Sequence, residues 1–502
     1  MTADTEKTED SVDHDARARQ RLVSALGLQG LGRMLRDFAT YLPTQAIPAV
    51  AGFIVLPVLA RKLSPTDVGI LAIAQTLISL GWTAFGAWLA AAIVREFPAA
   101  RETGDLGSFR STLVRGLALV LGAIGIFAAL LGVAAMVSSA VGKTLPLVLA
   151  AVVAMTLQNT AVSLFAANLR PRAYAAAEVT GRVGGMAAGT ALVFNGYGVA
   201  GYLASLAVAS AVVGLIALPF AWPRTDRHEG HARSDVRTWI AYGVPTSMGS
   251  IVLWALIFVD RYLLAALKNA GAVGIYTIGN TLGDKVVMVP MFAFATAATP
   301  LLITEFERNG RERVERLLRS YTRFVFLVGV PCIAFVAAAG SNIVTIIAGL
   351  HYVEYAPAAR VAPVVAVGSL IFALATMANT GLAVARRTKF LIVSSTIGLG
   401  VNVVANLLLI PRFGIEGAAI ATPIGNLAYL LATYHWSRRY ATWHIPYATL
   451  IRTCVAAAAG YGAAVAVSIG TSRLLDIGLD AVIGLTVYLA LLGLLGEHRS
   501  AA

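Results

Sequence analysis

Long, nearly uninterrupted apolar runs constrain this sequence more than any other feature. Val199–Phe220, Val286–Leu302 and Ala362–Ala385 approach or exceed the roughly 18 residues that can cross a lipid bilayer as a helix. Hydrophobic residues make up 58% of the chain and charged residues 13%, whereas about a quarter of a soluble domain is charged. A globular protein of this composition could not cover its surface with polar groups. We therefore expect an all-α, polytopic membrane protein.

About fourteen transmembrane helices can be placed along the chain. They lie near 40–60, 68–94, 112–137, 145–167, 175–194, 199–222, 239–259, 273–302, 321–340, 362–385, 390–410, 417–436, 450–469 and 481–495. The connecting segments alternate in charge, with about 29 Lys and Arg on one side and about 8 on the other. The positive-inside rule then places both termini in the cytoplasm. We expect the chain to lie in the cell inner (plasma) membrane. The net charge of +13 reflects this topology, so we do not expect nucleic acid as a partner.

The sequence divides into five parts. Residues 1–37 form a cytoplasmic tail and an interfacial helix, because Leu22, Leu26 and Phe38 follow helical spacing among arginines. The polar first 20 residues contain no visible cleavable signal peptide. The other parts are an N-terminal six-helix lobe, a cytoplasmic linker, a C-terminal six-helix lobe, and two additional helices with a short tail, at residues 38–222, 223–238, 239–440 and 441–502.

An internal repeat supports the two lobes. Three short segments recur in the same order at offsets of about 202 to 216 residues. The segments and their echoes are Tyr41–Thr44 and Tyr242–Thr246, Leu59–Ile70 and Leu264–Ile275, and Gly196–Gly201 and Arg412–Gly417. Many alternating-access transporters consist of two such lobes with the substrate site between them. A duplicated scaffold without transport is the alternative interpretation.

The same segments resemble the polysaccharide transporters of the multidrug/oligosaccharidyl-lipid/polysaccharide (MOP) flippase superfamily. The strongest match is Asn406–Thr422, between the predicted spans eleven and twelve. The other similar segments are Leu59–Ile70, Asp260–Leu264, Ala272–Tyr276 and Ile347–Ala356. The resemblance covers about residues 38–440, and its ordered set of motifs is more specific than any one of them.

The resemblance implies a fold and a cargo. The two pseudo-symmetric six-helix lobes would form a V around a cationic central cavity, and the cargo would be a sugar chain linked to undecaprenyl diphosphate. A protein of this kind needs no cofactor, and its partners would be the lipid-linked oligosaccharide, the lipid bilayer and, as further candidates, a polysaccharide polymerase or export machinery. Transport would feed exopolysaccharide, O-antigen or capsule assembly.

Ionisable residues inside spans are the first candidates for the site, because each is costly in a bilayer unless it faces a cavity or a partner. Lys285 lies near the middle of its predicted span and is a candidate phosphate contact. Asp284 is a candidate for gating or ion coupling, with Asn280 four residues earlier on the same helix face. Because adjacent helical residues point about 100° apart, Asp284 and Lys285 are not expected to pair with each other. Structural pairing with other helices is the alternative.

Two further charged pairs lie in or beside spans. Arg182 is a candidate phosphate contact at the inward opening, although it could simply pair with Glu178 one turn earlier. Glu178 is also a candidate for ion coupling. Asp260 and Arg261 end the seventh span and could form a gate, but an ion pair on the surface is the simpler interpretation.

Uncharged polar residues inside spans complete the candidates for substrate binding. Those singled out are Gln45, Gln75, Asn402 and Asn406. Asn402 and Asn406 share one helix face. Hydrogen bonding between helices explains most such residues in membrane proteins, so we expect many of them to be structural.

The sequence favours a secondary-transporter-type flippase and leaves two alternatives within the same superfamily. A multidrug/cation antiporter is expected to carry a carboxylate for proton exchange in its N-terminal lobe, where Glu178 is the candidate. A peptidoglycan lipid-precursor flippase also has fourteen helices. A membrane-embedded polymerase or ligase would need a large outer loop, and all the predicted outer loops are short. No convergent nucleophile and base is evident, so we expect no enzyme activity and no catalytic or metal site.

Overall fold

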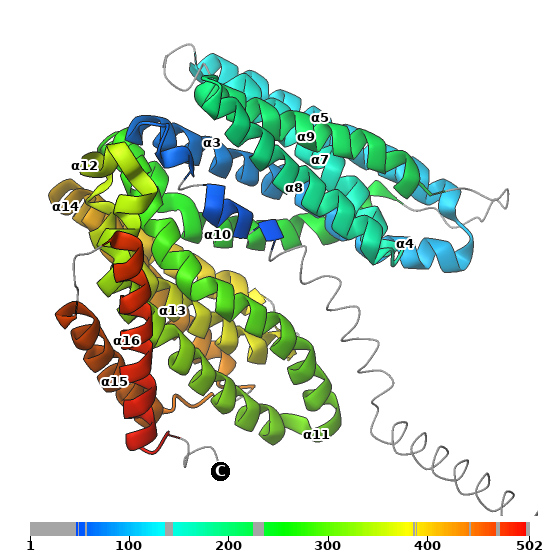
Figure 1. Cartoon of the computed structure of the whole chain (residues 1–502). Coiled ribbons are helices and arrows are strands. Elements are labelled where there is room, and N and C mark those ends of the chain that lie inside the picture. The colour runs from blue at the N-terminus through cyan, green and yellow to red at the C-terminus, as the bar shows by residue number, and fades with distance from the viewer. Residues whose placement is uncertain are drawn as a thin grey trace, which may run out of the picture.

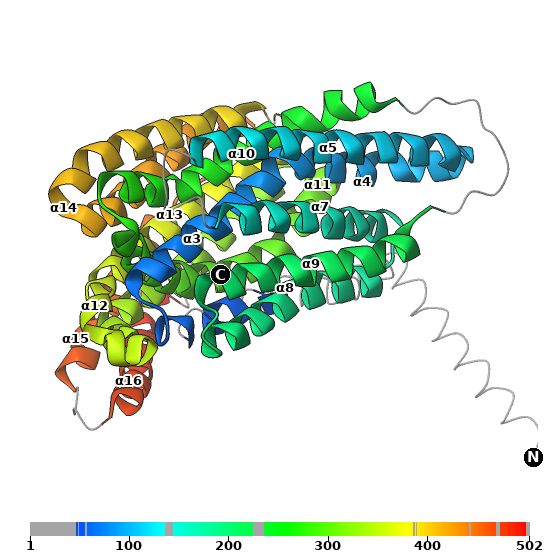
Figure 2. The same cartoon turned by 90° about the horizontal axis from the view of Figure 1, so that it is seen from above.

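The structure is a computed structural model that describes residues 47–48, 50–55, 58–135, 144–223, 235–384, 387, 389–440, 443–467 and 472–497. All regular secondary structure within these residues is helical, which confirms the predicted fold class. The predicted interfacial helix, Gln45 and most of the predicted linker lie outside the described residues. The helices form two bundles that are seen side by side in Figures 1 and 2.

The first bundle contains the helices before residue 222. They are α3 (Pro65–Gly81), the π-helical turn η1 (Trp82–Gly86), α4 (Ala87–Thr103), α5 (Leu106–Ala135), α7 (Leu145–Ala167), α8 (Pro171–Phe194) and α9 (Gly198–Ala221). Helix α9 packs against both α7 and α8, so these three helices form the core of the bundle. The chain from α3 to α4 continues through η1 as one long span.

The second bundle contains α10 (Val236–Leu267) and α11 (Ala270–Ala348), which are followed by a short turn. The turn consists of η2 (Gly349–His351) and α12 (Tyr352–Tyr355), and the later helices are α13 (Ala358–Val384), α14 (Lys389–Ser437), α15 (Tyr447–Ala466) and α16 (Arg473–Leu494). Helix α13 packs between α11 and α14.

Two of these helices are each broken by one glycine. The 79 residues of α11 would extend about 120 Å as a straight helix, but its backbone reverses at Gly310 (φ 73°, ψ −167°). Helix α14 breaks in the same way at Gly414 (φ 57°, ψ −128°). Ten described helices are long and apolar enough to cross a membrane. With the short apolar helix Val50–Ala60, α8 and the second spans created by the two breaks, they match the predicted fold of about fourteen spans.

The sequence repeat is visible in the local geometry. Ser64 and Asn269, 205 positions apart, each cap a helix by accepting a hydrogen bond from the backbone N–H three residues later (3.3 and 2.9 Å). Gly198 and Gly414 occupy equivalent turns with φ of 55° and 57°, a left-handed conformation that favours glycine. The two copies therefore build the same turns in both bundles.

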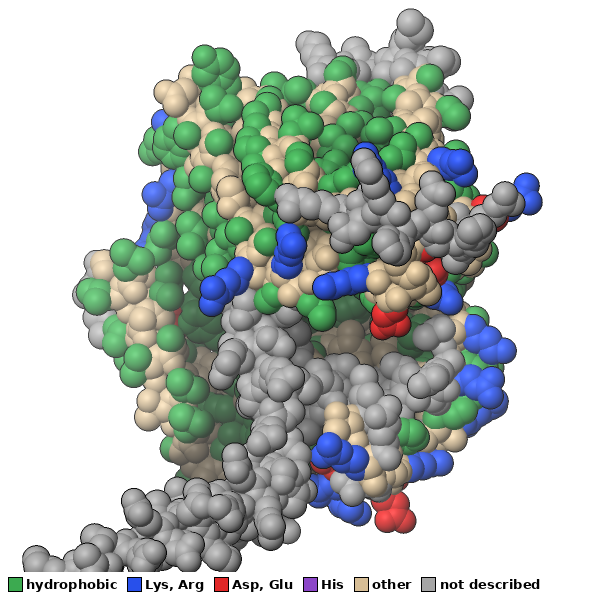
Figure 3. Space-filling model, turned by 90° about the vertical axis from the view of Figure 1, so that its right-hand side faces the viewer, with side chains coloured by type: hydrophobic (Ala, Val, Ile, Leu, Met, Phe, Trp, Pro, Cys, Tyr) green, Lys and Arg blue, Asp and Glu red, His purple; other side chains and the backbone are tan. Residues whose placement is uncertain are grey.

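The bundles meet at one end of the molecule and diverge at the other (Figure 1). We call the end that carries Ser64 and Asn269 the closed end, and the end that carries Ala221 and Gly310 the open end. Figure 3 views the open end and shows Lys and Arg side chains spread over this face, with few Asp and Glu among them. The divergence gives the V shape that the family resemblance implies.

The repeated segments themselves form the contact at the closed end. Gly69 of α3 and its echo Gly274 of α11 lie against each other's helix, and a Cβ on Gly69 would overlap the carbonyl oxygen of Ala270. A Cβ on Gly274 would likewise overlap the carbonyl oxygen of Pro65. The two helices are thus in backbone contact, which only glycine allows at these positions.

Polar contacts reinforce this seam, which we define as the contact of α3 with the start of α11. The Arg61 guanidinium donates to the carbonyl oxygen of Ile346 across the two bundles (2.9 Å). The Tyr355 hydroxyl donates to the carbonyl oxygen of Leu63 (3.2 Å). Both bonds join residues nearly 300 positions apart, so the seam fixes the relative position of the bundles at the closed end.

The last helices are anchored at the open end by Glu497, just beyond α16. Its carboxylate accepts hydrogen bonds from Arg323 (2.6 Å), Arg452 (3.0 Å) and Thr449 (2.7 Å). Burial would raise the pKa of Glu497, but these three donors together lower it below its ordinary value. The anchor therefore contributes stability at neutral pH that is lost as the pH falls through the lowered pKa.

We predict that Gly274→Ala opens the closed end, because the added methyl group overlaps the α3 backbone. Spin labels on Lys62→Cys and Leu350→Cys, in a background without the native cysteines, would report the separation of the bundles by pulsed electron resonance. We expect a longer distance to become the major population. The matched control is Gly400→Ala, where a Cβ meets nothing within 4 Å. An unchanged distance in Gly274→Ala would contradict the assignment of the seam.

Candidate functional site

A cavity of about 420 Å³ lies between the two bundles. Side chains from α3, α8 and α9 line it on one side, and side chains from α10 and the first half of α11 line it on the other. A second cavity of about 430 Å³ extends from it into the second bundle, between α10, α11, α13 and α14. The two share the lining residues Phe258, Arg261, Thr281 and Lys285. We call them together the interlobe cavity, with a first and a second chamber.

Three cationic side chains line the first chamber, and they come from three helices of both bundles. They are Arg182 of α8, Arg261 of α10 and Lys285 of α11. The side chains of Arg182 and Lys285 are 42% and 40% exposed. The structure thus brings together the two predicted phosphate contacts, and it adds Arg261 to them.

Each of the two predicted cations is held by a carboxylate of its own helix. Arg182 Nη2 lies 2.7 Å from Glu178 Oε1, and the buried Glu178 side chain orients the guanidinium. Lys285 Nζ lies 3.1 Å from Asp284 Oδ2. The expectation that Asp284 and Lys285 would not pair was wrong, because the long lysine stem spans the angle between neighbouring positions.

A second polar contact fixes Asp284. Its Oδ1 accepts a hydrogen bond from the Ser369 hydroxyl of α13 (2.9 Å), so the carboxylate bridges Ser369 and Lys285. Ser369 and Asn426 both line the second chamber. The second chamber therefore combines polar lining groups with apolar ones such as Phe372.

Arg261 is held by a buried network instead of a surface ion pair. Asp260 and Arg261 are only 4% and 9% exposed, which excludes the surface interpretation. Asp260 accepts hydrogen bonds from the Tyr276 hydroxyl and from the Arg261 backbone N–H (2.8 Å). Arg261 Nη2 donates to Asn280 Oδ1 (3.1 Å), and the guanidinium lies over the Phe258 ring (4.9 Å to the centroid).

One donor of Arg261 is left available. Its Nε is buried and has no hydrogen-bond partner among the described residues. Buried donors in folded proteins nearly always have a partner. Arg261 thus brings a positive charge to the lining of the first chamber, which makes it a candidate for an anion contact.

The predicted polar residues fall into two groups. Gln75 lines the first chamber and Asn280 lines the second. Asn402 and Asn406 are buried in α14 and line neither chamber; Asn406 donates to Asn402 Oδ1 (3.0 Å), and Asn402 donates to the carbonyl oxygen of Ala421 (3.2 Å). The bond from Asn402 to Ala421 crosses the break at Gly414 and joins the two halves of α14, and Asn406 holds the Asn402 side chain from within the first half. Both residues thus have the structural role that hydrogen bonding between helices predicts.

Sequence reasoning missed two lining residues, Ser369 and Asn426, and also Tyr276, which belongs to the buried network around Asp260. Tyr276, Ser369 and Asn426 carry no charge at neutral pH, and nothing in their spacing distinguishes them from other polar residues in spans. A signal existed for Tyr276, because it follows directly on the repeated segment that ends at Ile275. Its contact with Asp260 depends on the packing of α10 against α11, which the sequence does not show.

The fold and the charged cavity between two repeated bundles define a polytopic transporter of the MOP flippase superfamily. Residues 34–304 match the family described as "Polysaccharide biosynthesis protein", and the chain belongs to this family. Residues 245–408 also match the family described as "MatE". The resemblance found in the sequence is thus confirmed.

Individual proteins are more distant. An uncharacterized membrane protein, YabM of Bacillus subtilis (strain 168), is 25% identical over 236 residues, which are 44% of this chain and 43% of the length of YabM. The solved lipid II flippase MurJ, in an inward closed conformation, matches with a TM-score of 0.74 and 13% identity over 91% of this chain and 99% of that chain. An inward-facing MATE family multidrug resistance transporter matches with a TM-score of 0.60 and 14% identity over 78% and 94%. These structures show the shared fold.

We predict that the interlobe cavity is accessible from the open end only. Thr281→Cys, in a variant whose Cys332 and Cys454 are replaced by serine, should react with a membrane-impermeant maleimide applied on the side of the open end. Leu350→Cys, which is fully exposed at the closed end, should react only from the opposite side and serves as the control. Equal labelling of Thr281→Cys from both sides would contradict the closed seam.

Proposed function

We propose that this protein flips an undecaprenyl-diphosphate-linked oligosaccharide across the plasma (inner) membrane. The observation that carries the proposal is the convergence of Arg182, Arg261 and Lys285 in one chamber between the bundles. A diphosphate is the part of such a lipid that most resists entry into a bilayer, because its charge is costly in hydrocarbon. Three cationic side chains in the cavity would replace the hydration that the diphosphate loses when it leaves the aqueous phase.

The second chamber suits the sugars. Asn280, Ser369 and Asn426 offer amide and hydroxyl groups, and Phe258 and Phe372 offer apolar faces. Sugars present both hydroxyl groups and apolar C–H faces, so this mixture of lining groups matches their chemistry. The apolar lipid tail would remain in the bilayer while the headgroup occupies the two chambers.

The orientation supports uptake from the inner leaflet. The positive-inside rule assigns the open end, with its many Lys and Arg side chains, to the cytoplasm. The cavity in this conformation would receive cargo there, and the seam would separate to release it on the other side. Both termini would then be cytoplasmic, and a polysaccharide polymerase or export machinery would act on the released cargo.

The carboxylates suggest how binding would be coupled to movement. Glu178 and Asp284 each hold one cation of the first chamber, and Asp260 positions the third through its own network. A bound diphosphate would compete with Glu178 and Asp284 for Arg182 and Lys285. Release of these carboxylates would make them available to a proton or another cation, which is the proposed role of these residues in gating and ion coupling.

Two alternatives differ in their cargo. A multidrug/cation antiporter would need a cavity that attracts cations, whereas the first chamber presents Arg182, Arg261 and Lys285. A peptidoglycan lipid precursor carries the same diphosphate on the same kind of lipid, so the first chamber suits it equally. The solved lipid II flippase MurJ has the same fold as this chain, and this likeness of fold favours the second alternative.

The test is a strain in which the gene is deleted and single variants are returned. Loss of the protein should cause a lipid-linked oligosaccharide to accumulate inside the cell while surface polysaccharide disappears, and mass spectrometry of the lipid would identify the cargo. Arg261→Gln or Lys285→Gln should restore little polymer. Loss of one charge-assisted hydrogen bond of about 1.5–3 kcal/mol weakens binding roughly 10- to 150-fold.

The matched controls are exposed cationic residues in, or at the ends of, the helices that carry the cavity cations. Arg172→Gln, at the start of α8, and Lys268→Gln, just after α10, should restore polymer fully because neither lines the cavity. Intact surface polymer in the deleted strain, together with sensitivity to cationic dyes, would instead identify an antiporter. Accumulation of a peptidoglycan precursor would identify the other alternative.

A further inference from the structure

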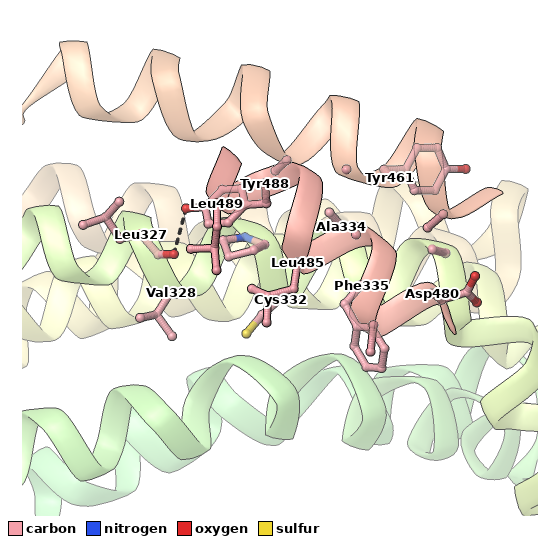
Figure 4. Close-up of a pocket in the computed structure, with 17 residues that line it drawn as sticks. Leu327, Val328, Cys332, Ala334, Phe335, Tyr461, Asp480, Leu485, Tyr488 and Leu489 are labelled. Carbon is pink, nitrogen blue, oxygen red and sulfur yellow. Dashed lines mark hydrogen bonds between the residues drawn. The ribbon is translucent and has the colours of Figure 1, made fainter. Parts of the chain in front are cut away.

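A separate groove lies on the flank of the second bundle, between α11, α15 and α16. Its volume is about 400 Å³, within the range of about 300–1,000 Å³ that holds small molecules. We call it the C-terminal groove. Its lining is almost entirely apolar, and it shares no residue with the interlobe cavity. In Figure 4, Asp480 and Tyr461 lie towards one end of the groove, and Leu327 and Tyr488 lie towards the other.

Close helix packing creates this groove. Gly460 of α15 and Gly484 of α16 are in contact, since a Cβ on Gly460 would lie 2.6 Å from the carbonyl oxygen of Gly484. Small residues such as Ala464 leave the space above this contact empty. The Tyr488 hydroxyl donates to the carbonyl oxygen of Leu327 (2.8 Å) and ties α16 to α11 at the other end of the groove (Figure 4).

The groove opens towards lipid. Val482, Leu485 and Leu489 of α16 are exposed, and Leu485 and Leu489 also line the groove. In a span, such exposed apolar side chains face the hydrocarbon of the bilayer. An occupant of the groove would therefore come from the membrane and would carry an apolar chain.

Two buried carboxylates mark one end of the groove. Asp480 lines it and is 7% exposed, and Asp476 lies one turn earlier and is 6% exposed. Among the described residues, neither carboxylate has an ion-pair or hydrogen-bond partner, and Asp476 Oδ1 is completely buried. The nearby Arg473 guanidinium lies instead over the Tyr352 ring (5.6 Å to the centroid).

This arrangement is unfavourable without a cation. Like charges at i and i+4 repel each other, and a carboxylate buried without a partner loses its hydration. An ammonium group offers three N–H donors and one positive charge, which would satisfy both Asp476 and Asp480. A phosphate without an amine would be repelled, and a trimethylated amine has no N–H to donate.

We propose that the C-terminal groove binds a membrane phospholipid whose headgroup carries a primary amine. The amine contacts Asp480 and Asp476, and one acyl chain lies along the apolar lining towards Tyr488. Asp480 lies about 10 Å along α16 from its first residue at the closed end, which is a depth suited to a lipid headgroup of that leaflet. The lipid would brace α15 and α16 against α11, whatever cargo the interlobe cavity carries.

Native mass spectrometry of the full chain in detergent tests this proposal. The protein would be offered equal amounts of phosphatidylethanolamine, its N-acetylated derivative with the same acyl chains, and phosphatidylglycerol. We expect phosphatidylethanolamine to be retained about tenfold more than the other two, the change that corresponds to one charge-assisted contact. Asp480→Asn should abolish this preference, whereas Glu354→Gln, an exposed carboxylate near the same end, should keep it.

A second variant separates binding from folding. Ala481→Phe fills the groove and leaves both carboxylates in place, so it should reduce the retention of phosphatidylethanolamine while the variant still elutes as a folded monodisperse protein. Equal retention of the N-acetylated lipid by the unchanged protein would overturn the proposal. Displacement of the bound lipid by a polyprenol, in the unchanged protein and in Asp480→Asn alike, would also overturn it and assign the groove to an apolar chain alone.

Discussion

A charged side chain inside a bilayer must find a partner, and this requirement shapes the structure. The three cations of the interlobe cavity are all paired or networked in this way. Arg182 and Lys285 each lie beside a carboxylate of the same helix, and Arg261 is fixed by Asn280 and Phe258. These side chains reach one chamber because their helices are held there by the close backbone packing of the seam.

That packing comes from the internal repeat. The segment around Gly69 and its echo around Gly274 form one contact, in which each copy of the motif closes against the other. The motif therefore has a structural role. It also defines the conformation that is open at one end, because the bundles can diverge at the open end only while the seam holds them together at the closed end. A motif that occurs twice because of duplication becomes a self-complementary interface between the two copies.

The sequence predicted the class of fold and much of its detail. Apolar run length, charge alternation and the repeat are local or periodic signals, so they can be recognised in the sequence without knowledge of how the helices pack. They predicted about fourteen spans and the recurrence of the segments that hold Gly198 and Gly414, and the i, i+4 spacing offered the pair of Arg182 with Glu178 as an alternative to a phosphate contact. The fine geometry of side chains did not follow from them. Asp260 and Arg261 end the predicted seventh span and resemble a surface pair in the sequence, yet α10 continues to Leu267 and both residues are buried. Asn402 and Asn406 are polar residues inside a span, as several cavity residues are, but Asn402 bonds across the break of α14 to Ala421 and Asn406 bonds to Asn402.

A structure of the full chain with an undecaprenyl-diphosphate-linked sugar, determined by electron cryo-microscopy in a lipid nanodisc, tests the central claim most directly. The account predicts diphosphate density in the first chamber within hydrogen-bonding distance of Arg182, Arg261 and Lys285, with Lys285 or Arg182 displaced from its carboxylate. Density for the diphosphate outside the interlobe cavity, with all three cations still bound to their present partners, would contradict it.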